Sequence, residues 1–525
     1  MLLRRLRPRL SRGLLTSTLS IVALLPVVAF VLNRADWTPE AAYHSWWILG
    51  SALMSGGWRV QLGAAGVVVL ALAMARFPWR RIAPGHPALR RMALFLALIH
   101  AWPLVLYPLN HWYGQGHWLD RAAVGFLAVA ILRHPAFLAP FLFVSGLISH
   151  QFAYPIGGFT ATDKVLPHLP LQLLTCFALC RTFLRVRPRH LVVALIPGVV
   201  SCYFLPGCAK LALGNGLTWL WEDRLTNLLV ARHQYGWLGW IPEPTLLAVA
   251  GRMGPVDGGM RLLSLCFELG APLMVFRRSW SVALLVLLAG FHLGVLALSG
   301  IFFWKWIATD LVIAAYLRRL DPGAWTARNA RILALGVLLV LGLVPRLWPV
   351  PRLGWLNTPF VERYVLVGLA RSGERYAIPP GWFGGYSTIF AQNRFQYLDP
   401  GRSLTYTFGS TQDPSVHAAL VDRPSLAIAA ELIATKGVVR FEERRRARFS
   451  EFIHVTCVRP LPATITFERL LETISCPQHI LGSPPGSYSG QEPLSEVVVL
   501  LRRSIYDGQG VVHGDDQELL RVPLR

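Results

Sequence analysis

The chain has 525 residues, of which 54% are hydrophobic and only 15% charged, with a mean hydropathy of +0.45. This composition excludes an ordinary soluble globular protein and predicts a polytopic membrane protein. The formal net charge of +23 does not indicate nucleic acid as a partner, because the early basic residues stand between apolar runs, as membrane topology requires. After about residue 345, Arg, Glu, Pro and Gly mix into the sequence, so we expect a transmembrane domain over 1–345 and a second domain over 346–525.

Apolar runs of about 15 or more residues predict membrane-spanning helices. In chain order they lie near 14–32, 59–75, 92–109, 168–184, 191–213, 260–276, 280–299, 301–317 and 330–345. The stretch 122–149 is longer than one span and is interrupted by Arg133, His134 and Pro135, so two short helices in a hairpin are expected there. The fold class is therefore an α-helical membrane bundle of about nine to eleven segments.

Arginine placement predicts the orientation of this bundle. Five arginines precede the first run, which is too long for a cleaved signal sequence and is interpreted as a retained helix. The arginine-rich connections alternate consistently if the N-terminus is cytoplasmic, while the long outer loop carries Arg224, Arg232 and Arg252. Residues 346–525 then form an extracytoplasmic α+β domain, with strand-like runs at 425–433 and 496–501 and a basic run at 444–448 typical of a solvated helix face.

Lysine is rare in this chain and marks the first candidate site. Of 51 basic residues only four are lysines, namely Lys164, Lys210, Lys305 and Lys436. Lys210 lies near the outer end of the run 191–213. A lysine withdrawn from water can lose its proton and act as a base, whereas arginine stays charged. Lys210 is therefore a candidate catalytic base, with a snorkelling side chain as the alternative interpretation.

Further polar residues are expected in the same outer half of the bundle. At 1.5 Å per residue, Glu268 lies about 12 Å and His292 about 17 Å along their runs. Tyr203 precedes Lys210 by seven residues and Ser299 follows His292 by seven, so each pair shares a helix face. Glu268 is also interpretable as a structural ion-pair partner, and His292 as a packing histidine.

The remaining polar residues give weaker indications. His150, Asp163, Lys164 and His168 are expected in an outer loop between two spans. Lys305, flanked by tryptophans, is typical of an interfacial anchor, and Asp310 follows it on one polar stripe. Cys457 and Cys476 fall in the outer domain, and the sequence does not decide whether they form a disulfide. No motif has the spacing of a metal site.

Three short blocks resemble vitamin K-dependent gamma-carboxylases and the horizontally transferred transmembrane family around them. Tyr203-Phe-Leu-Pro-Gly-Cys-Ala-Lys210-Leu211 is similar to that family's aromatic and Gly-x-x-Lys-Leu motif, and Trp219 or Trp221 supplies the tryptophan that follows. Phe291-His292 with Ser299 to Phe303 is similar to a Phe-His and Ser-x-x-Phe pair. Ser149-His150-Gln151-Phe152 with a later Asp163 resembles an Asn-His-x-Tyr block. The resemblance covers about residues 90–320.

This resemblance implies an integral membrane enzyme that couples oxidation of a reduced naphthoquinone by O2 to modification of an extracytoplasmic peptide, such as carboxylation of glutamate with CO2. It gives Lys210 the role of base and places His150 in the same site. Together with the expected polar cluster, we therefore expect Lys210, His150 and Glu268 to be catalytic and Tyr203, His292 and Ser299 to bind the quinone. Membrane lipid, the quinone and a peptide substrate are the expected partners. The alternative, from another class, is a non-catalytic membrane protein that binds, exports or gives immunity to a peptide.

Overall fold

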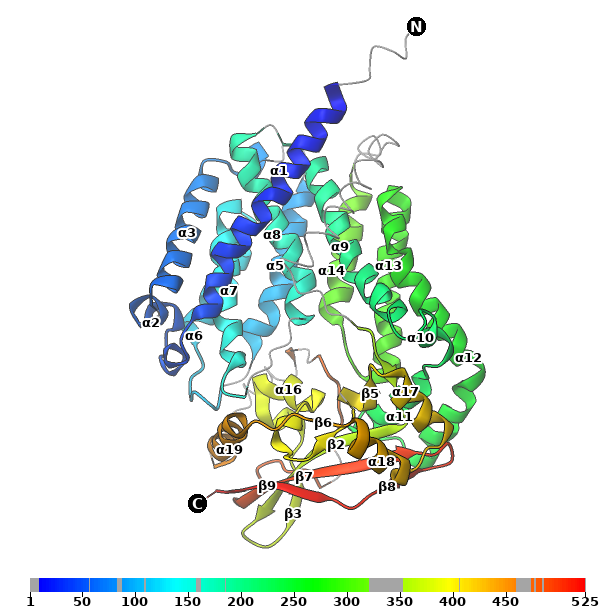
Figure 1. The fold of residues 1–525 in the computed structure, drawn as a ribbon. Coiled ribbons are helices and arrows are strands. Elements are labelled where there is room, and N and C mark those ends of the chain that lie inside the picture. The colour runs from blue at the N-terminus through cyan, green and yellow to red at the C-terminus, as the bar shows by residue number, and fades with distance from the viewer. Residues whose placement is uncertain are drawn as a thin grey trace.

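The computed structural model describes residues 9–55, 57–82, 87–107, 110–156, 162–184, 186–320, 353–405, 407–458, 474–475, 478–483 and 486–524. It has a helical N-terminal region followed by a C-terminal α+β region with a curled antiparallel sheet (Figure 1). The C-terminal region lies at one end of the helical bundle, and the start of α1 lies at the other. The predicted fold class is confirmed.

The helices of the N-terminal region follow one another with short connections. They are α1 (Arg9–Leu32), α2 (Ile48–Ser55), α3 (Gly57–Ala75), α4 (Trp79–Ile82), α5 (Pro87–Leu106), α6 (Trp118–Ala130), α7 (Leu138–His150), α8 (Thr162–Phe183), α9 (Pro188–Leu211), α10 (Thr218–Trp221), α11 (Leu225–Gln234), α12 (Glu243–Gly270), α13 (Arg278–Ser299) and α14 (Trp304–Arg318). Among the described residues, seven helical segments are long and apolar enough to cross a membrane: Thr16–Trp37, Gly57–Ala75, Pro87–Leu106, Pro135–Ala153, Pro188–Leu211, Glu243–Val275 and Arg278–Ser299. These segments indicate an integral membrane protein.

The predicted segments compare closely with these helices. The runs at 168–184 and 301–317 are α8 and α14, which pack in the bundle but are not among the seven. The stretch 122–149 forms two helices in contact, α6 and α7, joined by a turn at Pro135, as the hairpin interpretation expected. The run at 330–345 lies outside the described residues. Helix α12 begins at Glu243, well before the expected start at 260, so Arg252 lies on a helix instead of in a loop.

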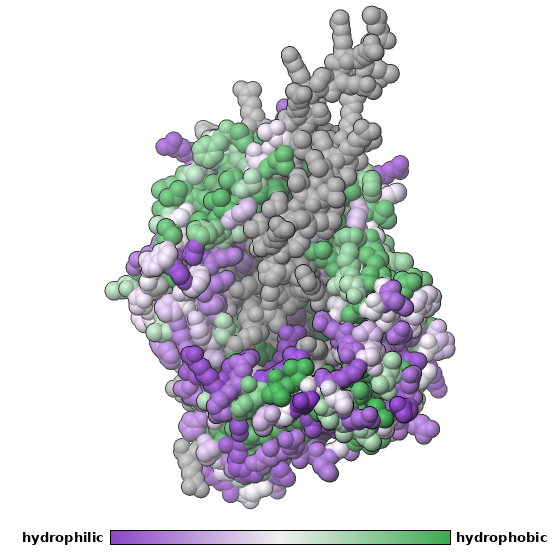
Figure 2. All heavy atoms as spheres, in the orientation of Figure 1, coloured by the Kyte–Doolittle hydropathy of each residue, from purple (hydrophilic) through white to green (hydrophobic). Residues whose placement is uncertain are grey.

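Burial differs strongly between the long helices. In α3 and α13 only 22% and 28% of the most apolar window is buried, whereas in α9 the figure is 83%. The outer helices therefore expose apolar side chains such as Val69 and Leu287. Figure 2 shows hydrophobic atoms gathered on the half of the molecule that holds the bundle, above a mainly hydrophilic C-terminal half. Helix α9 lies at the centre, so polar residues on it face protein instead of lipid.

The sheet of the C-terminal region is built on two long strands. Strand β2 (Phe360–Ala370) pairs antiparallel with β7 (Leu494–Tyr506) along its whole length, with Val365 opposite Leu500. Strand β3 (Arg375–Ala377) pairs with β2, while β8 (Val511–His513) and β9 (Gln517–Pro523) share the other edge of β7. The predicted strand at 496–501 is confirmed within β7. Two short ladders complete this region: β1 (Leu356–Asn357) with β5 (Ser410–Thr411), and β4 (Arg402–Ser403) with β6 (Val438–Val439).

Four helices pack around the sheet: α16 (Ser387–Gln392), α17 (Pro414–Asp422), α18 (Leu426–Lys436) and α19 (Glu443–Val458). The prediction of a strand at 425–433 is wrong, because the hydroxyl of Ser425 accepts a hydrogen bond from the Ile428 amide and caps α18. Burial of Ala429 against Leu420 then holds the helix in place. The basic run at 444–448 lies on α19, as expected for a helix face.

Polar contacts join the two regions. Arg448 of α19 donates to both carboxylate oxygens of Glu40 at 2.7 and 2.6 Å. The Asn357 amide of β1 donates to Asp223 at 2.5 Å, in the loop between α10 and α11. Burial raises the pKa of Asp223 to about 7. Cys457 is a free, buried thiol, and Cys476, its proposed partner, lies outside the described residues.

Candidate functional site

Tyr203 and Lys210 both project from the central helix α9 and are buried. The seven-residue spacing places them on one face of α9, two turns apart. Residues from α12, α13 and α14 meet this face and form two polar groups inside the bundle, Lys210 with Glu268 and Tyr203 with His292 and Asp310. We refer to the two groups together as the polar cluster. The prediction that polar groups from these helices lie in the same part of the bundle holds for five of the residues named from the sequence: Tyr203, Lys210, Glu268, His292 and Asp310.

Lys210 pairs with Glu268 of α12. The Nζ of Lys210 lies 2.5 Å from Oε1 of Glu268, and both residues are buried. The other carboxylate oxygen, Oε2, has no hydrogen-bond partner among the described residues. Gly207 makes this approach possible, because a Cβ there would lie 3.0 Å from the Cβ of Glu268. The small Gly207 therefore lets α12 approach α9 closely, and this brings Glu268, the ion-pair partner of Lys210, next to the lysine.

The indole of Trp219 completes the surroundings of the lysine. The ammonium group of Lys210 lies 4.8 Å from the centre of this ring, a cation–π contact. Trp221, the other tryptophan considered from the sequence, is 71% exposed. Leu356 of β1 packs against Trp219, so the C-terminal region closes this end of α9.

Two turns deeper along α9, Tyr203 joins Asp310 and His292. Its hydroxyl donates to Oδ2 of Asp310 at 2.5 Å and lies 3.1 Å from Nε2 of His292. A phenol has a single proton, so with that proton directed at Asp310 the imidazole donates from Nε2 and its Nδ1 is an acceptor. Within the described part of the chain, neither this Nδ1 nor Oδ1 of Asp310 has a hydrogen-bond partner. The group thus offers unoccupied acceptors inside the bundle.

Aromatic rings line the deeper group. The ring of Trp306 lies 5.5 Å from those of both Tyr203 and His292, and Phe303 lies 5.2 Å from His292. From the sequence, Trp306 counted only as a neighbour of the anchor Lys305, yet it is buried. Asp310 was recognised as a polar residue without a role. The sequence held one indication of its role: Asp310 lies six residues after the start of an apolar helix that begins with aromatic residues.

His150 lies elsewhere. It ends α7, where its Nδ1 is 3.9 Å from Asp36 and its ring contacts Tyr154. In the described part of the chain no contact joins His150 to Lys210 or Glu268. The role that the resemblance gives His150 stays a prediction.

Ser299 also lies apart from the cluster. Its hydroxyl donates to the Val295 carbonyl at 2.7 Å and accepts from the Ile301 amide at 3.2 Å, which ends α13. Its backbone carbonyl accepts from the guanidinium of Arg232. Its assignment to quinone binding is likewise untested.

The supposed outer loop before the lysine is partly helical. His168 lies on α8, where its Nε2 is 2.7 Å from Nε2 of His100 on α5, and both rings are buried. No pattern in the sequence signalled this pair, because the two residues belong to helices far apart in the chain. The side chains of Asp163 and Lys164 are outside the described set.

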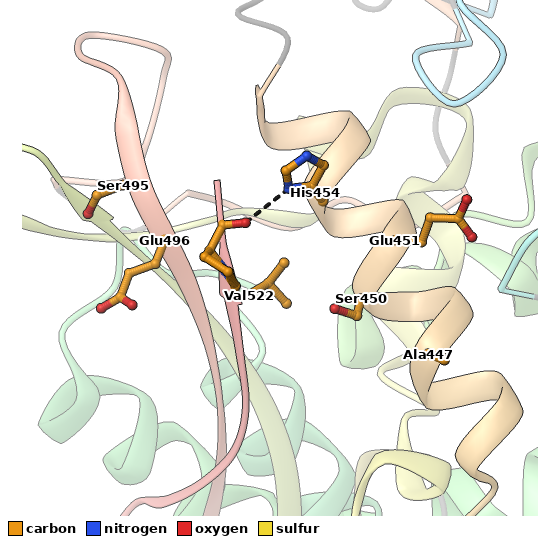
Figure 3. A pocket seen from close by; sticks show the side chains of 8 residues that line it. Ala447, Ser450, Glu451, His454, Ser495, Glu496 and Val522 are labelled. Atoms are coloured by element: carbon orange, nitrogen blue, oxygen red, sulfur yellow. Dashed lines mark hydrogen bonds between the residues drawn. The ribbon is translucent and has the colours of Figure 1, made fainter. Parts of the chain in front are cut away.

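A separate hollow of about 900 Å³ lies on the C-terminal region, between α19 and the strands β7 and β9 (Figure 3). Its histidine and its two glutamates already have partners. His454 contacts the Pro523 carbonyl at 2.9 Å, Glu451 pairs with Arg448 at 3.0 Å, and Glu496 pairs with Arg521 at 2.5 Å. The hollow therefore offers no free charged group, unlike the cluster in the bundle.

Comparison of the chain with known protein families, with curated proteins and with solved structures finds no match. The assignment of function rests on the residues and geometry described above.

Proposed function

We propose that this chain is an integral membrane enzyme that takes protons from a reduced naphthoquinone through Lys210 and Glu268 and couples its oxidation to modification of an extracytoplasmic peptide. The observation that supports this most is the burial of five ionisable side chains, Lys210, Glu268, Tyr203, His292 and Asp310, in two groups along one face of α9. Ionisable groups inside a membrane bundle are costly and mark functional sites.

The Lys210–Glu268 pair suits proton transfer. At 2.5 Å between Nζ and Oε1, a proton can move from the ammonium to the carboxylate. This movement leaves a neutral amine, which can accept a proton from a hydroxyl group of a bound molecule. Arginine cannot take this role, because it does not give up its proton under accessible conditions.

The free polar atoms of the cluster fit a hydroquinone. Hydroquinone hydroxyls are hydrogen-bond donors and need acceptors. Oε2 of Glu268, Nδ1 of His292 and Oδ1 of Asp310 have no hydrogen-bond partner in the part of the chain that the structure describes. Trp219 and Trp306 supply flat apolar surfaces beside the two halves of the cluster. When bound, a reduced naphthoquinone supplies the reducing equivalents that O2 consumes.

The orientation proposed for the enzyme follows the arginine pattern, with a cytoplasmic N-terminus and an extracytoplasmic C-terminal region. It is supported by the position of the C-terminal region at the bundle end opposite the start of α1. Because β1 packs directly over the lysine end of α9, a peptide held by the C-terminal region would lie near the cluster.

The test uses purified full-length protein with reduced menaquinone or vitamin K, O2, labelled bicarbonate and a glutamate-containing peptide. Formation of quinone epoxide is expected, with label in the peptide if the modification is carboxylation. Lys210→Ala and Lys210→Arg should both abolish epoxide formation, whereas Lys305→Met, which removes the lysine beside Trp304, should retain it. Equal turnover in wild type and Lys210→Ala would refute the role of this lysine.

A second candidate function is favoured by the same 2.5 Å contact. If Lys210 and Glu268 form only a structural ion pair, the bundle is a scaffold for a non-catalytic protein that binds, exports or gives immunity to a peptide. Lys210→Arg separates the two, because an arginine preserves an ion pair but not a proton acceptor. Peptide binding that survives Lys210→Arg, without epoxide formation in wild type, would favour the scaffold.

A further inference from the structure

Two arginines at one boundary of the bundle pair with no acidic residue of the described chain. Arg34 lies in the short 3-10 helix η2 (Asn33–Trp37), which ends the first spanning segment, and Arg59 lies in the first turn of α3. Figure 1 shows α2, which separates these two positions in the chain, at the end of the bundle nearer the C-terminal region. Asp36, close to Arg34 in sequence, lies 3.9 Å from Nδ1 of His150. Among the described residues, the two positive charges therefore have no counter-ion.

The two arginines come from elements that are packed together. Gly63, one turn after Arg59 on α3, faces Arg34, because a Cβ at this glycine would clash with the Cβ of the arginine. The guanidinium carbon of Arg34 lies 3.8 Å from the centre of the Phe30 ring, and that of Arg59 lies 3.8 Å from the centre of the Trp37 ring. An aromatic face attracts a cation without neutralising its charge. The Nε of Arg34 is buried and, within the described part of the chain, has no hydrogen-bond partner.

The aromatic rings beside these arginines face away from the protein. Phe30 is 53% exposed, Trp37 is 51% exposed, and Trp58, which precedes Arg59, is 66% exposed. Phe30 belongs to a spanning helix, so its exposed ring contacts the acyl chains of lipids. Exposed tryptophans are typical of the headgroup boundary of a membrane. The two guanidinium groups therefore lie at the depth of the lipid phosphates, where a charge needs an anionic partner or water.

We propose that Arg34 and Arg59 bind the phosphate groups of phospholipids, with preference for anionic lipids, in the leaflet on the side of the C-terminal region. Phosphate oxygens accept hydrogen bonds from a guanidinium and neutralise its charge. Because the two guanidinium groups lie over different rings, each contacts a phosphate of its own. The exposed apolar rings beside them require a ligand that also carries acyl chains, which a free phosphate ion does not. The surface is separate from the polar cluster and does not depend on quinone chemistry.

The experiment identifies the lipids beside Arg34. Full-length protein with Phe30→p-benzoylphenylalanine, which keeps an aromatic ring, is placed in nanodiscs that contain a minority of phosphatidylglycerol in phosphatidylcholine. After irradiation, mass spectrometry counts the adducts of each lipid. The share of phosphatidylglycerol among the adducts should exceed its share of the bilayer about fivefold, the effect of one arginine near an anionic lipid. The same label at Val69, an exposed position farther along α3, should report the bilayer composition.

Arginine variants decide whether the charge causes the enrichment. Arg34→Gln should return the adducts at position 30 to the bilayer composition, whereas Arg34→Lys should keep most of the enrichment. A label in place of Trp58 tests Arg59→Gln in the same way, so the proposal does not depend on one variant that has to fold. Arg445→Gln, which removes an exposed arginine of the C-terminal region, should leave both results unchanged.

Two outcomes would overturn the proposal. One is a phosphatidylglycerol share in the wild-type adducts equal to its share of the bilayer. The other is an enrichment that persists unchanged in Arg34→Gln and in Arg59→Gln. Native mass spectrometry of the unlabelled protein gives a second readout, in which the double variant Arg34→Gln with Arg59→Gln should retain fewer phosphatidylglycerol molecules than wild type, and equal retention would also contradict the proposal.

Discussion

The ion pair between Lys210 and Glu268 predicts a pattern of stabilities that no exposed pair would give. Coulomb's law at 2.5 Å gives about 7 kcal/mol of attraction for an effective dielectric constant of about 20. Removing both groups from water offsets much of this, so the net value of the pair is small. Removing one partner, in contrast, leaves the other charge buried alone.

We therefore expect Lys210→Met and Glu268→Leu each to lower the free energy of unfolding by about 3–5 kcal/mol, and the double variant to lie close to wild type or above it. The assay is unfolding in mixed micelles with increasing SDS, followed by tryptophan fluorescence, with Lys305→Met as the control. A double variant destabilised by the sum of the two single changes would show that the residues are not coupled, and would refute the structural argument. A stable double variant also serves the functional test, because it should fold and yet form no quinone epoxide.

Three further changes have effects that the structure specifies. Gly207→Val places a side chain 3.0 Å or less from α12 and should lower the unfolding free energy by about 1–3 kcal/mol. The control Gly290→Ala adds a Cβ that meets no atom within 4 Å, and should change the unfolding free energy by less than about 1 kcal/mol, the difference in helix propensity. Equal effects of the two variants would contradict the close approach of α9 and α12. Burial raises the pKa of Asp223 from 3.8 to about 7, so between these pH values the folded protein binds more protons than the unfolded chain. Its stability should therefore fall as the pH rises from about 4 to about 7, and then level off. In Tm measurements from about pH 4.5 to 7.5, Asp223→Asn should flatten this slope, and an unchanged slope would exclude Asp223 as its source. Arg448→Ala breaks the two contacts to half-buried Glu40 and should lower the free energy of unfolding by about 1 kcal/mol. The double variant Glu40→Arg with Arg448→Glu exchanges the two charges and should recover part of this loss. If it recovers nothing, the packing of the arginine side chain matters and its charge does not.

The bundle was predictable because the signal for a membrane helix is local. A run of apolar residues needs no information about its neighbours to be read as a span, and most of the predicted runs correspond to observed helices. The prediction failed where polar residues interrupt a helix. The part of α12 that precedes the predicted run contains Asp257, whose carboxylate accepts from the Leu225 amide at 3.0 Å and lies 3.5 Å from Arg261. These partners come from packing, which a hydropathy pattern does not contain.

The candidate site was predictable one helix at a time. The seven-residue interval between Tyr203 and Lys210 indicates a shared face, and that follows from helix geometry alone. Which carboxylate meets which base depends on how helices cross, and here Gly207 decides it by admitting Glu268. The same reasoning explains why Asp310 gained its role only with the structure. Its partner Tyr203 lies 107 positions away in the sequence.

Two buried cations, Lys210 and Arg232, show why this chain uses a lysine at one position and an arginine at another. Lys210 is buried beside a carboxylate at 2.5 Å, so its proton has a place to go within the protein. Arg232 is buried beside an imidazole and a helix carbonyl, and among the described residues no carboxylate pairs with it. A lysine at position 232 would lose its charge when desolvated, whereas arginine keeps it. One cation is therefore placed where its proton can move, and the other is placed where its charge persists.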